Sequence, residues 1–189
     1  MGGRVILAAL LGGLALFLWG WVAHMALPLG TMGLSNLPTG EAQVAEALRS
    51  HVTTAGVYVV PGFDPARKWD GAYQESIASQ RKAGPYALMV VVPKDALSMD
   101  SSQLVNEAGT SITLALIAAF LILVAGGLSS LWARLLFCVL LACFGLLQTD
   151  VRFWNWYQFP GTFTLAQVID KVAGGVILGL VIHLVYRRR

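Results

Sequence analysis

Charged residues are scarce in this chain of 189 residues, of which only 12% are Asp, Glu, Lys or Arg. Soluble domains carry about 25% charged residues, and 57% of this chain is hydrophobic, so most of it does not face water. The formal net charge is only +3. The basic residues form no cluster interleaved with aromatic side chains, which argues against nucleic-acid binding.

Cysteine is the next scarce residue, with only Cys138 and Cys143 in the chain. Both lie in one apolar run, and at about 100° per residue they are separated by roughly 140° around a helix. They form neither a CxxC redox motif nor a disulfide, so we interpret them as small packing residues. The polar segment contains no cysteine and must therefore fold without disulfide bonds.

The familiar catalytic signatures are absent. The chain has no GxxxxGK[ST], GxGxxG, HExxH or GxSxG motif, which argues against the common nucleotide-binding, zinc-protease and serine-hydrolase sites. Ser79-Gln-Arg-Lys82 fits the loose SxxK pattern, but it lies on a polar helix, where a solvated face is the simpler interpretation. One histidine near scattered carboxylates does not make a metal site, so we predict no metal and no cofactor.

Long apolar runs take the place of these motifs. They cover residues 5–27, 111–127, 131–148 and 165–186. The first would form a helix ~34 Å long, enough to cross a bilayer core of about 30 Å. A cleaved signal peptide is the alternative, although its apolar region normally has about 7–15 residues. The sequence therefore predicts a membrane all-α fold, a four-transmembrane-helix bundle in the lipid bilayer.

Residues 30–110 form the only polar portion of the chain. Capping and turn residues bound four short elements within it. These are a helix capped by Thr39, a strand, a helix started by Asp64-Pro65 and a second strand, at residues 41–51, 56–62, 64–82 and 86–93. The order predicts a small α+β domain, inserted between the first two spans, whose two-stranded sheet is marginal alone.

Basic residues in the short flanks set the orientation. Because the spans alternate across the membrane, Arg4, Arg134 and the arginines at 187–189 share one side, and Arg152 and Lys171 share the other. Five basic residues against two place both termini in the cytoplasm by the positive-inside rule. We therefore predict a multi-pass membrane protein. The polar domain and an aromatic loop at 149–164 would be extracytoplasmic.

Asp170 is the charged residue that most requires a partner, because it lies ~9 Å into the fourth span. A charged group at mid-membrane costs about 3 kcal/mol, and less near an interface. His24 lies at a similar depth in the first span. We predict that His24 and Asp170 meet inside the bundle, with Asp150, Arg152 or Asn155 nearby. The simpler role is a buried polar pair that fixes helix register, and the alternative is a proton-relay, substrate or metal role.

Small residues mark the helix faces that should pack. At about 100° per residue, the small and polar residues of the fourth span, which Thr164 would cap, fall on one half of the helix and its branched residues on the other. Gly175-x-x-x-Gly179 allows close approach of a neighbouring helix. In the first span, small residues share a face with His24. The predicted packing glycines are Gly13, Gly20, Gly174, Gly175 and Gly179.

The predicted loop at 149–164 is crowded with aromatic and charged residues. It could be an aromatic belt at the headgroup level, a segment that docks another subunit, or a stacking wall for a flat ligand such as a pigment or quinone. The candidate binding or docking residues are Asp150, Arg152, Trp154, Asn155, Trp156, Tyr157 and Lys171.

Several motifs resemble those of an uncharacterised family of small bacterial four-span inner-membrane proteins. They are a first span ending Gly-x-x-x-His-Met, a VxVxPG strand, and WNWYxFPxxFTLAxxID before a glycine-containing last span. The most specific positions are Trp154 to Tyr157, Phe159-Pro160, Phe163 to Ala166 and Asp170. No activity is assigned to that family, so the resemblance implies a fold and a membrane location but no reaction.

Two main functions are compatible with these features. The first is a non-enzymatic accessory or structural subunit that binds other membrane-protein subunits, or itself, within a larger inner-membrane complex, which could be an energy-transducing one. The alternative is a membrane-embedded enzyme or small transporter centred on His24 and Asp170. A third, a solute-sensing module, would require a pocket between the two strands of the polar domain.

Overall fold

The computed structural model describes residues 2–94 and 100–187. The chain divides into two compact units, a helical unit formed by Met1–Ser35 with Met99–Arg189 and a polar unit formed by Asn36–Ser98. The mostly helical architecture and a small separate α+β unit agree with the sequence prediction.

The helical unit contains four helices that are long and apolar enough to cross a membrane. This agrees with the number of predicted spans and is consistent with a multi-pass membrane protein. The candidate spans are Gly2–Ala26, Ser101–Val124, Leu131–Tyr157 and Gly161–Arg187. The helices within them are α1 (Gly2–Trp21), α4 (Ser101–Val124), α5 (Leu131–Gln148), α6 (Asp150–Tyr157) and α7 (Gly161–Arg187).

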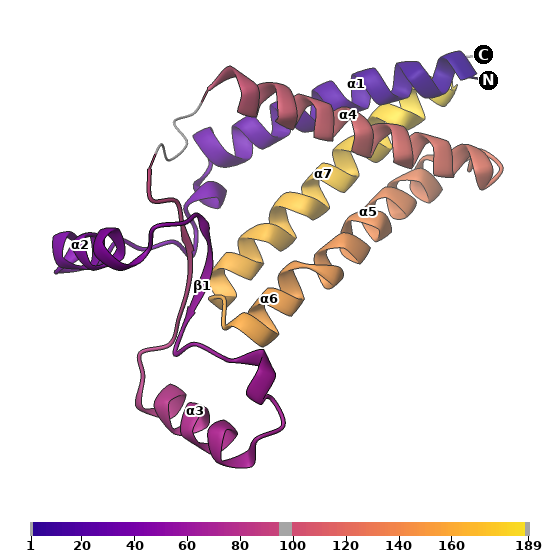
Figure 1. Ribbon diagram of the computed structural model, residues 1–189. Helices are drawn as coiled ribbons and strands as arrows, with labels where there is room; N and C mark the ends of the chain where they lie inside the picture. The colour runs from indigo at the N-terminus through magenta and orange to yellow at the C-terminus, as the bar shows by residue number, and fades with distance from the viewer. Residues whose placement is uncertain (1, 95–99, 188–189) are drawn as a thin grey trace. The chain divides into compact units, whose positions relative to one another are not determined.

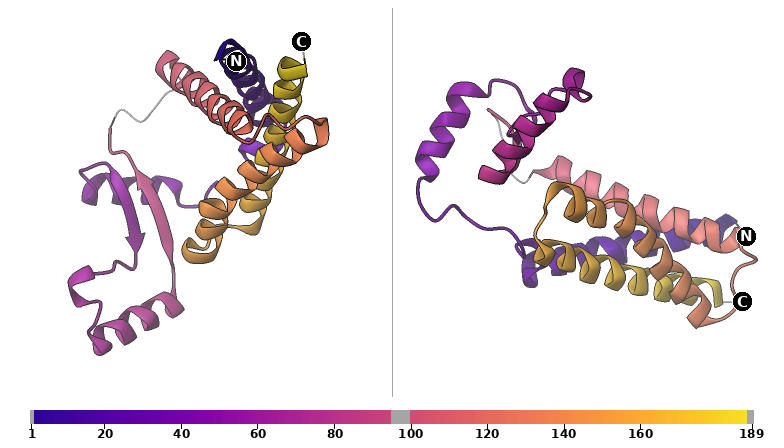
Figure 2. Two further views of the ribbon diagram at one scale, coloured as in Figure 1. Left: turned by 90° about the vertical axis from the view of Figure 1, so that its right-hand side faces the viewer. Right: turned by 90° about the horizontal axis from the view of Figure 1, so that it is seen from below.

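The four spans form an open row in the order α4, α1, α7, α5 (Figures 1 and 2). Helix α1 packs along both α4 and α7, and α5 packs along α7, whereas α4 and α5 touch each other little. The shared core is made largely of small residues, which let helix backbones approach closely. Its buried residues include Ala8, Ala115, Ala118, Ala119, Cys138 and Ile182.

Glycines account for the closest helix contacts. A Cβ at Gly13 would lie 2.6 Å from the Cα of Ile112 in α4, and one at Gly179 would lie 2.9 Å from the Cα of Leu135 in α5. Gly174 and Gly175 also lie against neighbouring helices, α1 and α5. Gly20 differs from the prediction: a Cβ there would meet nothing within 4 Å, so it is not a packing glycine.

The segment 149–164, predicted as a loop, is largely helical. Helix α6 follows α5 almost without a break, because Thr149 still donates its amide to Gly145 and accepts the amide of Phe153. Helix α7 begins at Gly161, directly after Pro160, so Thr164 is not its cap. The Thr164 hydroxyl is instead buried, without a hydrogen-bond partner in the described parts of the chain.

The polar unit contains α2 (Glu41–His51), β1 (Gly56–Val60), α3 (Gly71–Ala83) and β2 (Ala87–Val91). The strands form an antiparallel pair with Gly56 opposite Val91 and Val60 opposite Ala87. Two caps differ from the prediction. The residue before α2 is Gly40, which makes no side-chain cap, and α3 is capped by Asp70 after a 3₁₀ turn at Pro65–Arg67. Among the described residues of the polar unit, Ile77 is the one buried side chain.

Candidate functional site

A π-helical turn, Val22–Ala26, ends the first span and carries His24. Its defining hydrogen bond runs from the amide of Leu27 to the carbonyl of Val22, at 2.8 Å. Such turns insert an extra residue into a helix and often occur at functional sites. A Cβ at Gly30 would lie 2.8 Å from His24 Nδ1, so the absence of a side chain at Gly30 leaves room for the imidazole ring.

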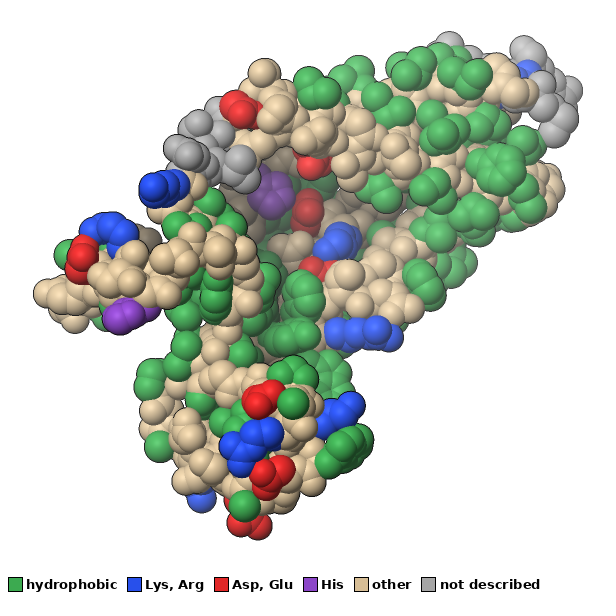
Figure 3. Space-filling view, viewed as in Figure 1, with side chains coloured by type: hydrophobic (Ala, Val, Ile, Leu, Met, Phe, Trp, Pro, Cys, Tyr) green, Lys and Arg blue, Asp and Glu red, His purple; other side chains and the backbone are tan. Residues whose placement is uncertain are grey.

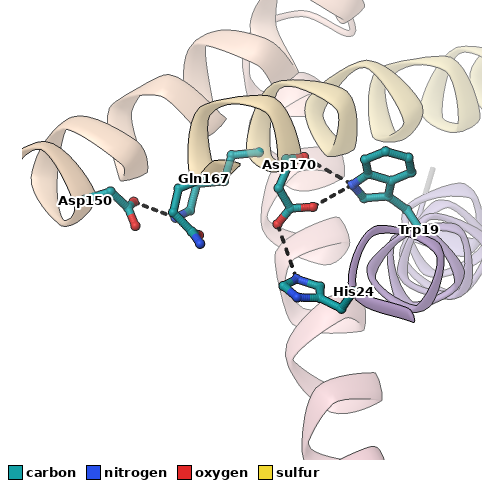
Figure 4. Close-up of polar contacts among 6 residues, drawn as sticks. Trp19, His24, Asp150, Gln167 and Asp170 are labelled. Carbon is teal, nitrogen blue, oxygen red and sulfur yellow. Dashed lines mark hydrogen bonds and ion pairs between the residues drawn. The ribbon is translucent and has the colours of Figure 1, made fainter. Parts of the chain in front are cut away.

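Asp170 lies between Trp19 and His24 (Figure 4). The Trp19 indole donates to Asp170 Oδ1 at 2.8 Å and to the Asp170 carbonyl at 3.2 Å. On the other side, His24 Nε2 lies 3.9 Å from Asp170 Oδ2, too far for a direct hydrogen bond. The structure therefore brings His24 and Asp170 together, as predicted, and adds Trp19 as the residue that fixes the carboxylate.

A second polar pair lies beside the first. Lys171 Nζ donates to Asp150 Oδ2 at 2.5 Å and to Gln167 Oε1 at 3.3 Å, and the Thr149 hydroxyl also donates to Asp150. Asp150 is buried and Lys171 is half-buried. Because this lysine is already matched by its own carboxylate, it does not neutralise Asp170, and His24 is the one basic group within ion-pair distance of Asp170 in the described residues.

Both pairs line a recess of the helical unit. The space-filling view shows histidine, acidic and basic side chains gathered in a hollow between the helices (Figure 3). The side chain of His24 is 43% exposed and that of Asp170 is 23% exposed. Asp170 follows Gly161, the first residue of α7, by nine residues, which places it ~14 Å into the helix. Asp170 is thus partly exposed ~14 Å into α7, and His24 reaches it from near the end of the first candidate span.

The remaining docking candidates lie on α6, and among the described residues no hydrogen bond or ion pair joins them to the two polar pairs. Phe153 stacks with Phe159 at 5.3 Å between ring centroids, and Phe159 meets Phe163 edge-on at 5.1 Å. This ladder of rings closes the turn from α6 to α7. The exposed side chains beside it belong to Arg152, Trp154, Asn155, Trp156 and Tyr157.

Arg134 forms a polar cluster at the opposite end of the helices, which the sequence did not reveal. It is only 6% exposed. Its guanidinium donates twice to the Gly127 carbonyl, at 3.0 and 3.2 Å, and lies 3.2 Å from His183 Nδ1. The guanidinium also lies 5.4 Å from the centre of the Tyr186 ring, whose hydroxyl donates to the Ala119 carbonyl. The sequence predicts Arg134 only as a flanking charge that marks orientation, not as a buried residue.

No group of three or more His, Cys, Asp or Glu side chains is arranged to hold a metal ion within residues 2–94 and 100–187. Cys138 and Cys143 are both free. No protein-family model, curated protein sequence or solved structure matches the chain significantly. The geometry of the recess is therefore the main indication of function.

Two features of the recess could not be read from the sequence. Trp19 belongs to the α1 stripe that faces α7, with Gly12, Leu16 and Ala23 at spacings of four, three and four, and this periodicity is its available signal. Because the stripe is apolar, the sequence does not predict the hydrogen bond from the Trp19 indole to Asp170. The pairing of Lys171 with Asp150 depends on α6 being helical, which was not predicted.

Proposed function

We propose that the protein is a non-enzymatic accessory subunit of a larger bacterial inner-membrane complex, and that another membrane protein covers its polar recess. The supporting observation is the partial exposure of His24 and Asp170 inside segments long enough to span a bilayer. Lipid tails offer no hydrogen bonds, and a charged side chain at mid-membrane costs about 3 kcal/mol. A partner helix that covers the recess with polar side chains removes this cost.

The open row of helices supports the same proposal. Because α4 and α5 touch each other little, the described helices of the helical unit do not close the side of α1 and α7 between them. A partner helix seated there would complete a bundle with the small-residue packing that membrane helices use.

The aromatic side chains on α6 and the polar unit are the proposed additional contacts. Aromatic residues anchor many protein interfaces, and Trp156 is 73% exposed. The polar unit buries a single described side chain, Ile77, and a two-stranded sheet of this kind gains stability from a partner. By the positive-inside rule this unit would be extracytoplasmic and both termini cytoplasmic.

Purification in a mild detergent, followed by mass spectrometry of the intact complex, tests the proposal. We expect a stoichiometric partner to co-purify with the wild-type protein. Trp156→Ala should weaken its retention about 30-fold, the effect of losing a hot spot worth about 2 kcal/mol. Trp132→Ala is the matched control, because Trp132 is similarly exposed, at 77%, but lies on α5 at the other end. A monomer without a partner, in detergent and after crosslinking in membranes, would contradict the proposal.

The second candidate is a membrane-embedded enzyme or small transporter that uses His24 and Asp170, favoured by the π-helical turn that directs His24 toward the carboxylate. Labelling distinguishes the two. In a Cys138→Ser/Cys143→Ser background, Asp170→Cys in native membranes should react with a water-soluble thiol reagent if a water-filled path reaches this position. Under the subunit proposal, the same cysteine should react only after the partner has been removed.

A further inference from the structure

The start of α1, the end of α7 and the α4–α5 turn lie at one end of the helical unit (Figures 1 and 2). Arg134 is buried at this end, where it contacts Gly127 and His183. Four of the five guanidinium N–H groups have acceptors, provided by the Gly127 carbonyl and by the ring and carbonyl of His183. The guanidinium of Arg134 thus has hydrogen-bond acceptors for nearly all of its N–H donors. Its charge, however, is buried against carbonyls, an imidazole and an aromatic ring, and none of these is an anion.

No carboxylate of the described residues lies within ion-pair distance of Arg134. The side-chain carboxylates of the described residues of the helical unit all lie toward the other ends of the helices. Along its own helix, Glu107 is ~25 Å before the end of α4, and Asp170 is ~20 Å before His183. Asp150 follows Arg134 by sixteen residues, which is ~24 Å along α5 and α6. Electrostatic attraction over such distances is weak.

Two further arginines are exposed at the same end. Arg4 lies in the first turn of α1 and Arg187 is the last residue of α7. One buried and two exposed arginines, with no acidic side chain of the described helical unit at the same end, give this end an excess of positive charge where lipid headgroups are expected. Guanidinium groups match phosphate oxygens in geometry as well as charge.

We propose that Arg4, Arg134 and Arg187 form a binding site for the phosphate group of an anionic phospholipid. The two exposed arginines contact the phosphate, and buried Arg134 contributes its charge and its one remaining N–H. The bound anion supplies the counter-charge that the described chain does not give to Arg134. This site is independent of the polar recess and of any protein partner.

The test is native mass spectrometry of the wild-type protein in detergent with equal amounts of phosphatidylglycerol or phosphatidylcholine. Each basic residue near an anionic surface contributes about 1 kcal/mol, or roughly five-fold in affinity. We expect phosphatidylglycerol to bind at least five-fold more tightly than phosphatidylcholine. Arg187→Gln should reduce this preference about five-fold, whereas Arg152→Gln, which removes an exposed arginine from α6 at the other end, should leave it unchanged.

Inorganic phosphate, added as a competitor, separates the headgroup from the free ion. Displacement of phosphatidylglycerol by millimolar phosphate supports a phosphate site open to either source. Absence of displacement, with the lipid preference intact, supports a site that requires the lipid. Equal binding of the two lipids by the wild-type protein would overturn the proposal.

Arg134→Gln is expected to lower phosphatidylglycerol binding in the same assay. Because it also removes the contacts to Gly127 and His183, a loss of folding is a possible complication. The double variant Arg4→Gln/Arg187→Gln alters only exposed side chains and avoids it. If this double variant binds phosphatidylglycerol as well as Arg152→Gln does, the proposal is refuted.

Discussion

The glycine contact between α1 and α4 allows a sharp test with a matched pair of substitutions, Gly13→Ala and Gly20→Ala. Both glycines lie on α1, and sequence periodicity placed both at packed positions. A Cβ at Gly13 would lie 2.6 Å from both the Cα and the Cγ1 of Ile112, whereas a Cβ at Gly20 would meet nothing within 4 Å. Ordinary Cβ contacts begin near 3.4 Å, so the backbone of α4 must retreat by about 0.8 Å to accept the methyl group, and overpacking of this kind costs about 1–3 kcal/mol.

The gain in helix propensity from Gly to Ala, about 1 kcal/mol, applies to both variants. It therefore cancels in their comparison, and we expect Gly13→Ala to be less stable than Gly20→Ala by about 1–3 kcal/mol. Equilibrium unfolding in mixed micelles with increasing SDS, followed by tryptophan fluorescence and circular dichroism, measures the difference. Equal stabilities would refute the packing of α1 against α4 at Gly13.

Two further predictions concern ion pairs. Lys171→Met should destabilise the helical unit by about 2 kcal/mol, because it leaves the Asp150 carboxylate without its ion-pair partner. The expected loss is smaller than for a fully buried pair, because Lys171 is half-buried. Lys171→Met with Asp150→Asn should recover most of that loss in the same unfolding assay, and a double variant no more stable than the single one would contradict the pairing. In the polar unit, the hydrogen bond from Arg67 and then that from the Tyr73 amide lower the pKa of Asp70 below its usual 3.8. The carboxylate of Asp70 therefore caps α3 fully above pH 3.8, and this contribution is lost as the pH falls through the lower pKa of Asp70 in the folded protein. As acid is added below pH 3.8, the NMR signal of the Tyr73 amide should shift. The same acid titration should not shift it in Asp70→Asn.

The four spans were predictable because their signal is local. Length and hydrophobicity decide whether a segment can cross a membrane, and both are properties of a continuous stretch of chain. The meeting of His24 and Asp170 was predictable for a related reason. Each lies at a similar depth from one membrane face, and a costly charge needs a partner, which leaves few alternatives in so apolar a chain.

The contacts that escaped prediction depend on how helices end. Helix α5 was expected to stop at Gln148, but α6 continues it, and this turns Asp150 from a loop residue into the buried partner of Lys171. The π-helical turn had a comparable effect on α1. Regular periodicity placed Gly20 on the face of His24, whereas the extra residue in the turn lets Trp19 and His24 both reach Asp170.

The burial of Arg134 could not be predicted, because the sequence pattern around it is typical of an exposed residue. A basic residue near a span end is normally read as a marker of orientation, and such residues usually extend toward the headgroups. Here the Gly126–Gly127 turn, with φ values of +79° and +85°, folds its carbonyl back toward the helix and holds the guanidinium beside His183. Sequence alone does not specify which arginine extends outward and which is retained.

The two ends of the helical row resolve their charges differently, and this difference makes the two proposals separable. At the recess, Lys171 pairs with Asp150 and His24 lies within ion-pair distance of Asp170, and the remaining need is for polar cover. At the Arg134 end, the hydrogen bonds are nearly complete and the remaining need is for an anion. Because the ends are ~20 Å apart, substitutions at one should not alter binding at the other. Trp156→Ala should therefore leave phosphatidylglycerol binding unchanged, and Arg187→Gln should leave partner retention unchanged. If either variant changed both measurements, the two ends would have to act as a single interface.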